Sequence, residues 1–205
     1  MIKNIIFDWS GVISNDFRLV YKTAMRIFDC LGAQRISFET YAKEVAIPPI
    51  NFYKKFVKNP DMNEINEMFK NIFPTVGKPT IYEGAKEVIK QLHDKGLKLI
   101  VLSTHTEVDN EAREYGIHEC FKEINTNVHD KIAVINEVLK RNSFLPSETA
   151  YVGDMTHDIK AGKAGGVKTI AITWGYDSKD KLEKVKPDFV IDDLKELDYI
   201  LQDIF

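Results

Sequence analysis

The sequence is poor in cysteine, with only Cys30 and Cys120 among its 205 residues. The two cysteines lie in different apolar segments, show no CxxC spacing and have no histidine cluster beside them. This pattern argues against a cysteine metal site and against a framework of structural disulfides. We therefore expect both to be buried thiols.

Long hydrophobic runs and a strong excess of one charge are also missing. No run approaches the length of a membrane span, and no basic start precedes an apolar stretch with a small-residue cleavage site. We therefore expect a cytoplasmic protein with no membrane partner. The net charge of -3 gives no general attraction to nucleic acid, so no nucleic-acid partner is expected. With 44% hydrophobic and 29% charged residues, the composition is that of an ordinary folded domain.

What the sequence does contain is an alternation of short apolar runs with helical patterns. Apolar residues recur at helical spacing over 85–92, before Gly96, and over 132–139. Short runs that end at polar residues predict buried parallel strands at 5–7, 98–102, 149–152, 167–172 and 189–191. The alternation predicts an α/β fold with a doubly wound, mostly parallel, Rossmann-like sheet.

The segment 16–80 breaks this rhythm, because it offers helical patterns at 19–28, 52–56 and 65–73 but no convincing strand. Pro74 and Pro79 predict the path by which the chain returns to the sheet. We therefore expect a small all-helical insert at 16–80 after the first strand. The core domain would then be 1–15 together with 81–205.

Polar residues follow the predicted strands where each strand ends. Asp8 follows the first strand, Ser103 and Thr104 follow the second, and Asp154 follows a later one, with Asp158 four residues on. Because the carboxyl ends of parallel strands share one edge of a sheet, we expect these side chains to converge there.

These residue types suit a divalent cation and a phosphoryl group. Asp8, Asp154 and Asp158 offer the hard oxygen ligands that Mg²⁺ prefers, and Asp8 is also placed to attack phosphorus in line. Lys131 can neutralise the charge of the phosphate. We expect the hydroxyl of Ser103 and backbone amides near Trp9 and Thr104 to donate hydrogen bonds to its oxygens.

Four segments, 7–12, 102–104, Lys131 and 153–158, together resemble the four motifs of the haloacid dehalogenase superfamily. The resemblance covers essentially the whole chain and is closest to the phosphoglycolate phosphatase-like and phosphonatase-like branches. It implies a magnesium-dependent phosphatase of a small phosphorylated metabolite that works through an aspartyl-phosphate intermediate. It also implies that the insert is a helical cap, and we expect a monomer or a homodimer.

The resemblance implies a role for each matching residue. Asp8 would be the nucleophile and a metal ligand, and the backbone carbonyl of Ser10 a second ligand. Asp154 would be the principal acidic ligand, assisted by Asp158. Ser103 and Lys131 would hold the phosphate.

Ser10 departs from the family pattern, because phosphatases of this family have a second Asp there as general acid and base. Because serine cannot take over this proton transfer, we expect catalysis to differ from that of the family's phosphatases. Asn15, Asp16 and His105 are candidates for activating water in its place.

Two alternatives to a phosphatase remain open. One is a catalytically weak phosphate-binding or regulatory protein. The other is carbon–phosphorus cleavage of the phosphonoacetaldehyde hydrolase kind, with Lys54 or Lys55 forming a Schiff base. Dehalogenation fits less well, because the phosphate-binding residue types serve no purpose there.

Overall fold

The computed structural model describes residues 1–203, which fall into two compact units. One unit is formed by Met1–Ser14 and by the chain from Ile81 onward, and the other is Asn15–Thr80. The two connecting segments, β2 (Ser14–Asn15) and β3 (Thr80–Ile81), pair with each other. Within the described residues, no helix combines the length and apolar character needed to cross a membrane.

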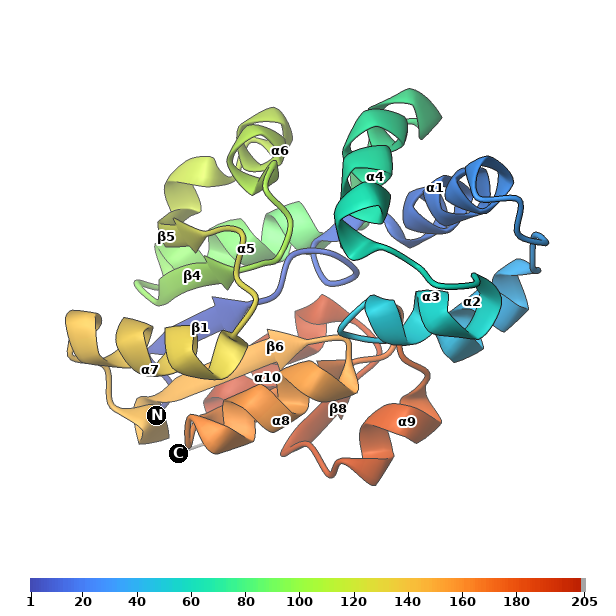
Figure 1. The fold of residues 1–205 in the computed structure, drawn as a ribbon. Coiled ribbons are helices and arrows are strands. Elements are labelled where there is room, and N and C mark those ends of the chain that lie inside the picture. The colour runs from blue at the N-terminus through green and yellow to red at the C-terminus, as the bar shows by residue number, and fades with distance from the viewer. Residues whose placement is uncertain (204–205) are drawn as a thin grey trace. The chain divides into compact units, whose positions relative to one another are not determined.

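The larger unit is built on a six-stranded parallel sheet (Figure 1). Its strand order is β5-β4-β1-β6-β7-β8. The strands are β1 (Asn4–Phe7), β4 (Lys98–Leu102), β5 (Phe121–Asn125), β6 (Thr149–Gly153), β7 (Lys168–Ile172) and β8 (Phe189–Ile191). This architecture confirms the predicted α/β fold with a doubly wound, mostly parallel sheet.

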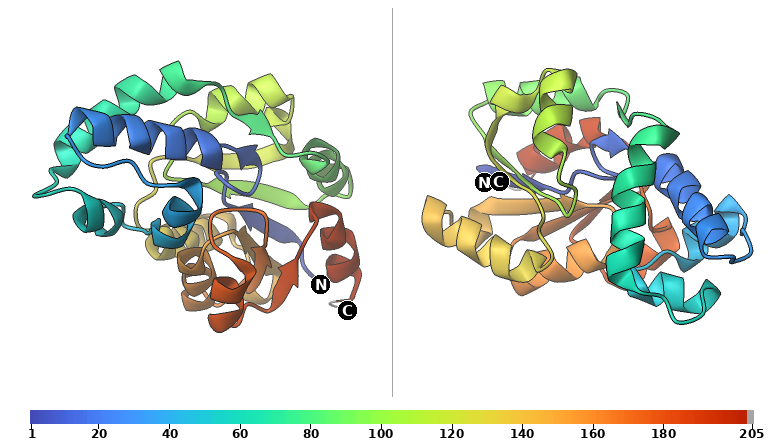
Figure 2. Two further views of the ribbon diagram at one scale, coloured as in Figure 1. Left: turned by 90° about the vertical axis from the view of Figure 1, so that its right-hand side faces the viewer. Right: turned by 45° about the horizontal axis from the view of Figure 1, so that its top comes forward.

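Helices cover both faces of this sheet, as Figures 1 and 2 show from three directions. On one face the core includes residues of α5 (Ala85–Asp94), α6 (Val108–Tyr115) and α10 (Leu197–Asp203). On the other it includes residues of α7 (Lys131–Asn142), α8 (Thr156–Ala164) and α9 (Lys179–Lys184). Short 3-10 helices lie at His118–Cys120, Pro146–Glu148 and Leu194–Glu196. Because both faces are buried, β1 and β4 consist mainly of apolar residues, as their sequences predicted.

Strand register decides which residues meet at the carboxyl edge of the sheet. In β1, Phe7 pairs with Val101 of β4 and with Val152 of β6. The backbone N–H of Asp8 then donates to the carbonyl of Val152 at 2.9 Å. The chain ends of β1, β4 and β6 therefore lie side by side at the point where the strand order reverses, which is where open α/β sheets bind ligands.

The smaller unit contains the four helices α1 (Phe17–Cys30), α2 (Phe38–Glu44), α3 (Ile50–Phe56) and α4 (Met62–Val76). Its interior is aromatic: Phe28 stacks on Phe52, and Tyr41 meets Phe52 edge to face. Pro74 lies inside α4 rather than in a return loop, so the helix continues two residues beyond it.

The expectation of buried thiols is wrong. Cys30 is the last residue of α1 and is exposed, because its position on the final turn faces away from the aromatic interior. Cys120 is half-buried, and both cysteines are free.

Candidate active site

Asp8 is the first residue after β1, and its side chain is almost fully buried. Its Oδ1 accepts the backbone N–H of Trp9 at 2.8 Å, and its Oδ2 lies 2.9 Å from Nζ of Lys131. Burial raises the pKa of the Asp8 carboxyl, although the neighbouring Lys131 ammonium opposes the shift. The carboxylate is thus presented at the sheet edge in a buried ion pair with Lys131, a cation that it shares with Asp158.

Lys131 is the first residue of α7, where a cation is unfavourable next to the positive end of the helix dipole. Two carboxylates compensate, since its buried Nζ lies 2.6 Å from Oδ1 of Asp158 as well as 2.9 Å from Asp8. Burial alone would lower the pKa of Lys131, but Asp158 and Asp8 raise it well above its usual value. Lys131 therefore stays protonated in this setting.

Asp158 serves the fold and the site at once. Its Oδ2 accepts the backbone N–H of Met155 at 3.0 Å and so caps α8, while Oδ1 faces Lys131 and accepts from Tyr151 at 3.2 Å. Burial alone would raise the pKa of Asp158, but Lys131, His157 and the amide of Met155 together outweigh burial and lower it. Both oxygens thus have partners, which favours contact with an ion through water over direct ligation.

Asp154 differs from Asp158 because one of its carboxylate oxygens has no hydrogen-bond partner within the described part of the chain. Oδ2 accepts the backbone N–H of Tyr176 at 2.7 Å, whereas Oδ1 is buried with no hydrogen-bond partner among residues 1–203. Burial, together with the charges of Asp158 and Asp8, raises the pKa of Asp154 well above its usual value. A buried, unpartnered carboxylate oxygen is costly, and a bound cation would remove that cost.

Two glycines leave room around Asp154. A Cβ on Gly11 would lie 2.2 Å from Asp154 Oδ2, and a Cβ on Gly175 would lie 2.3 Å from the same atom. Gly11 also has a φ of +76°, which is strained for any other residue. The backbone thus approaches this carboxylate as closely as it does because neither position carries a side chain.

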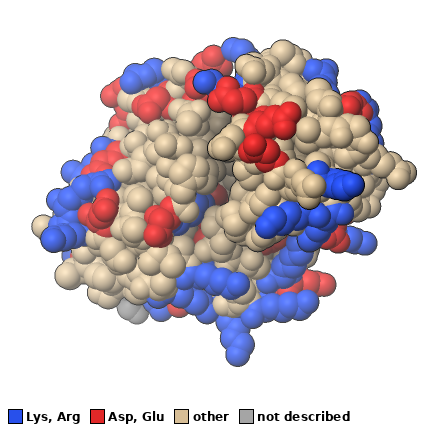
Figure 3. All heavy atoms as spheres, in the orientation of Figure 1, with Lys and Arg blue, Asp and Glu red and all other residues tan. Residues whose placement is uncertain are grey.

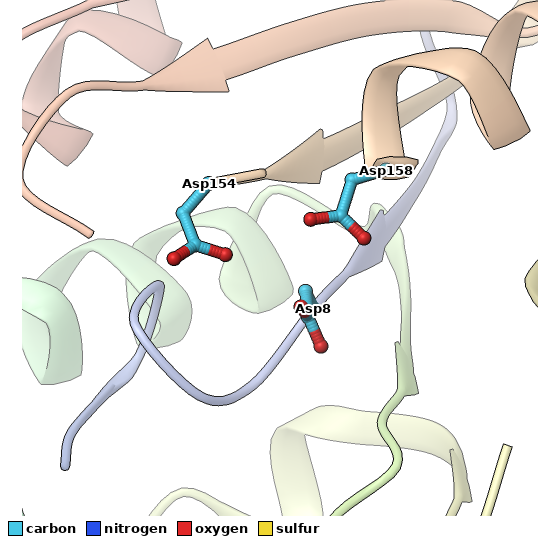
Figure 4. A group of neighbouring side chains, drawn as sticks. All are labelled: Asp8, Asp154 and Asp158. Atoms are coloured by element: carbon cyan, nitrogen blue, oxygen red, sulfur yellow. The ribbon is translucent and has the colours of Figure 1, made fainter. Parts of the chain in front are cut away.

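The three carboxylates point into one space (Figure 4). One oxygen from each of Asp8, Asp154 and Asp158 lies within 4.8 Å of the others, and all three residues are buried. Nζ of Lys131 offsets their charge at 2.9 Å from Asp8 and 2.6 Å from Asp158, and Nε2 of His157 lies 3.2 Å from Oδ1 of Asp158. The all-oxygen donor set, with the unpartnered oxygen of Asp154, fits a hard divalent cation.

The remaining predicted site residues occupy the loops after β1 and β4. Ser103 is buried, and its Oγ accepts the backbone N–H of His105 at 3.1 Å, while Thr104 beside it is exposed. Ser10 is half-buried and forms an isolated bridge with Ser14. The ring of Trp9 is fully buried and packs against Tyr115 and Phe121, so it fills the core rather than lining an open pocket.

The lysines considered for a Schiff base lie on α3, and both are exposed. Nζ of Lys55 lies 2.7 Å from Glu44, a partially exposed pair typical of a solvated surface. Among the candidates for activating water, Asn15 and Asp16 belong to the smaller unit, and His105 pairs with Glu111 at 2.7 Å.

The sequence interpretation missed Glu111, Tyr176 and Gly175 as neighbours of the site. Glu111 carries a signal in the sequence, because it shares a helical face with Val108, Ala112 and Tyr115 and is the only charged residue on that face. Tyr176 acts through its backbone amide, which no side-chain pattern reveals.

On the face drawn in Figure 3, acidic and basic side chains are interspersed, and neither charge covers the surface.

Fold and site together define an α/β protein with a buried centre of three carboxylates and one lysine where its parallel strands end. Residues 5–172 match the family model of haloacid dehalogenase-like hydrolases. The chain belongs to this family and is a hydrolase, as the sequence motifs predicted.

Relatives and solved structures of the family match over nearly the whole chain. Pyrophosphatase PpaX of Halalkalibacterium halodurans is 23% identical over 96% of this chain and 95% of its own length. Phosphoglycolate phosphatase of Vibrio vulnificus is 24% identical over 96% of this chain and 94% of its own. A haloacid dehalogenase-like hydrolase from Streptococcus pneumoniae has the same fold, with a TM-score of 0.88, 18% identity and 98% coverage of both chains.

Proposed function

We propose that this protein is a magnesium-dependent phosphatase that cleaves a small phosphorylated metabolite by way of a phosphoryl group carried on Asp8. The observation that supports it most is the buried cluster of Asp8, Asp154 and Asp158 beside Lys131, with one Asp154 oxygen unpartnered among the described residues. The names of the relatives, a pyrophosphatase and phosphoglycolate phosphatases, support a phosphoryl substrate.

Asp8, Asp154 and the backbone carbonyl of Ser10 would hold the cation, with Asp158 acting through water. When bound, a divalent cation offsets the charge between carboxylates and a phosphoryl oxygen, so that an anionic nucleophile can approach an anionic substrate. Lys131 supplies a fixed positive charge to the same group, and the hydroxyl of Ser103, whose oxygen accepts from His105, can donate its own proton to a phosphate oxygen.

In the first half of the reaction, a carboxylate oxygen of Asp8 attacks phosphorus and the bond from phosphorus to the leaving-group oxygen breaks. The electron pair of that bond stays on the leaving oxygen. In the second half, water attacks the same phosphorus, the bond to Asp8 breaks, and inorganic phosphate leaves with the free carboxylate restored. The second half needs a proton to be taken from the attacking water, and the first half needs one for the leaving oxygen when the leaving group is a poor one.

Ser10 occupies the position from which the family's general acid and base acts, and a hydroxyl does not titrate near neutral pH. The protein therefore favours substrates whose leaving group needs no protonation, such as phosphoanhydrides and aryl phosphates. Hydrolysis of the phosphorylated Asp8 is the slow half, because no carboxylate at position 10 activates the water. We further propose that the helical unit Asn15–Thr80 is the cap that selects the substrate.

Turnover of an aryl phosphate by the purified protein tests this function. We expect release of phosphate with magnesium, none after removal of the metal with EDTA, and full recovery when magnesium is returned. Parallel assays with pyrophosphate and phosphoglycolate compare an anhydride with an alkyl ester. Tight phosphate binding without turnover of any of the three would support a binding protein, and a borohydride-trapped lysine adduct with an aldehyde phosphonate would support carbon–phosphorus cleavage.

Asp154→Asn should stabilise the protein without metal and abolish its stabilisation by magnesium. The pKa of Asp154 is raised in the folded state, so its contribution to stability is present when it is protonated and is lost as pH rises through that folded pKa. Near neutral pH, where this carboxyl is ionised in the unfolded chain, Asp154 therefore destabilises the folded protein without metal, and a shift of one pKa unit already corresponds to about 1.4 kcal/mol.

Thermal unfolding of wild type and Asp154→Asn, in EDTA and in magnesium, measures both effects. Magnesium at a hundred times its dissociation constant should stabilise wild type by about 2.7 kcal/mol and the variant by nothing measurable. Asp180→Asn, the same change at an exposed position on α9, is the control and should behave as wild type. A variant less stable than wild type in EDTA, or one that keeps the magnesium effect, would contradict the assignment.

Gly11→Ala should cost both stability and magnesium affinity. The new Cβ would lie 2.2 Å from Oδ2 of Asp154, so the loop or the carboxylate must move, and the positive φ adds a cost of about 1–2 kcal/mol. Gly96→Ala is the matched control, because Gly96 has a φ of +85° but nothing within 4 Å of its added Cβ. Equal effects of the two substitutions on magnesium affinity, measured by titration calorimetry, would show that the close approach of Gly11 to Asp154 does not matter for the metal.

A further inference from the structure

Glu111 is a buried carboxylate that lies outside the three-carboxylate cluster. It stands on α6, on a face otherwise apolar, and is 8% exposed. Its Oε2 accepts Nε1–H of Trp9 at 2.6 Å and the hydroxyl of Ser14 at 3.0 Å, and its Oε1 lies 2.7 Å from Nε2 of His105. Burial alone would raise the pKa of Glu111, but the hydrogen bonds from His105 and Trp9 outweigh it and lower the pKa. The group is therefore an ionised acceptor of three donors.

Two of these donors come from the loop that carries the nucleophile. Trp9 follows Asp8 directly, and its backbone N–H donates to Oδ1 of Asp8 at 2.8 Å. Ser14 closes the same loop, since its N–H donates to the carbonyl of Trp9 at 2.9 Å and its own carbonyl accepts from Gly11 at 2.9 Å. Glu111 thus holds both ends of the turn that presents Asp8.

The third donor comes from the loop that carries the predicted phosphate-binding serine. His105 lies two residues after Ser103, and its backbone N–H donates to Oγ of Ser103 at 3.1 Å. One carboxylate therefore joins the loop after β1 to the loop after β4. Backbone hydrogen bonds still hold Asp8 and Ser103 at their strand ends, from Asp8 N–H to Val152 and from Ser103 N–H to Asn125. Beyond these residues the sheet ladder stops, so the placement of the loops and of the two side chains depends on contacts such as those of Glu111.

We infer that Glu111 is a positioning residue, which sets Asp8 and Ser103 at one separation through Trp9 and His105. This inference rests on the proposed phosphatase function, because it assigns Glu111 a part in phosphoryl transfer at that same site. Glu111 hydrogen-bonds neither Asp8 nor Ser103 in the interactions described, so its effect passes through the two intervening residues. A misplacement of reacting groups by about 1 Å can cost about a hundredfold in rate.

Glu111→Gln tests the inference, because the amide keeps the size of the side chain but offers only one acceptor oxygen and a donor in place of the other. We expect kcat for an aryl phosphate to fall by about tenfold to a hundredfold, with KM changed by less than about threefold. The magnesium-induced rise in unfolding temperature should persist, because the three carboxylates are unchanged. Glu114→Gln, the same change at an exposed position on α6, is the matched control and should keep the wild-type kcat.

Trp9→Phe provides a second route, because it keeps an aromatic ring in the core and removes the Nε1–H donor to Glu111, together with part of the buried ring volume. If Glu111 acts through Trp9, the double variant should lose little more kcat than the worse single variant. A kcat in Glu111→Gln within about twofold of wild type, or losses that multiply in the double variant, would overturn the inference. Absence of turnover in wild type is a separate outcome that refutes the proposed function and, with it, this role of Glu111.

Discussion

Asp8→Asn should lower kcat for an aryl phosphate by at least about 10⁴-fold, because the side chain that forms the covalent intermediate is lost. The amide that replaces the carboxylate is a poor nucleophile and carries no charge for a cation. Its oxygen can still accept the backbone N–H of Trp9, and Lys131 keeps its 2.6 Å pairing with Asp158. The fold should therefore survive, and the loss should be one of chemistry.

Initial rates with excess magnesium, together with a thermal unfolding curve for each protein, measure the two effects separately. Asp180→Asn makes the same change on an exposed turn of α9 and should retain the wild-type rate. A variant that folds, binds phosphate and still turns over within about tenfold of wild type would show that another group attacks phosphorus.

Ser10→Asp should raise kcat by about a hundredfold to ten-thousandfold for substrates with poor leaving groups, such as phosphoglycolate. The new carboxyl would stand two residues after the nucleophile, where it can protonate the leaving oxygen and then take a proton from the attacking water. Aryl phosphates should gain less in the first half of the reaction, because their leaving group needs no proton. The rate should also acquire a pH dependence from the new carboxyl.

Ser10→Asn is the matched control, because it has nearly the shape of aspartate and cannot exchange a proton. We expect it to leave the rate for phosphoglycolate close to that of wild type. A gain of equal size in both variants would show that the effect comes from shape or polarity, and no gain in Ser10→Asp would remove Ser10 as the cause of slow turnover.

Much of the fold was predictable because buried parallel strands leave a clear signal in the sequence. The runs that became β1, β4 and β6 are apolar because both faces of the sheet are covered. β5 was missed because it lies at the sheet edge, where Lys122 and Glu123 interrupt the apolar pattern. The exposure of Cys30 was missed because helical spacing alone does not tell which side of α1 the aromatic residues of α2 and α3 will cover.

The candidate site was predictable to the level of residue type and strand end. Parallel strands place Asp8 and Asp154 at one edge whatever the loops do, and the structure brings both together with Asp158. The sequence does not reveal which oxygens remain without partners, because that depends on the amide of Tyr176 and the close approach of Gly11. Nor does it reveal that Glu111 joins two loops, since the contact exists only after α6 packs on the sheet.

The central claim is that Asp8 carries the phosphoryl group, and peptide mass spectrometry of acid-quenched protein tests it most directly. With magnesium and an aryl phosphate in excess, the peptide containing Asp8 should gain the mass of one phosphoryl group. Because Ser10 leaves the second half slow, that adduct should accumulate in wild type and fade in Ser10→Asp. Turnover at full rate with the phosphoryl group on another residue, or on none at any quench time, would contradict the account.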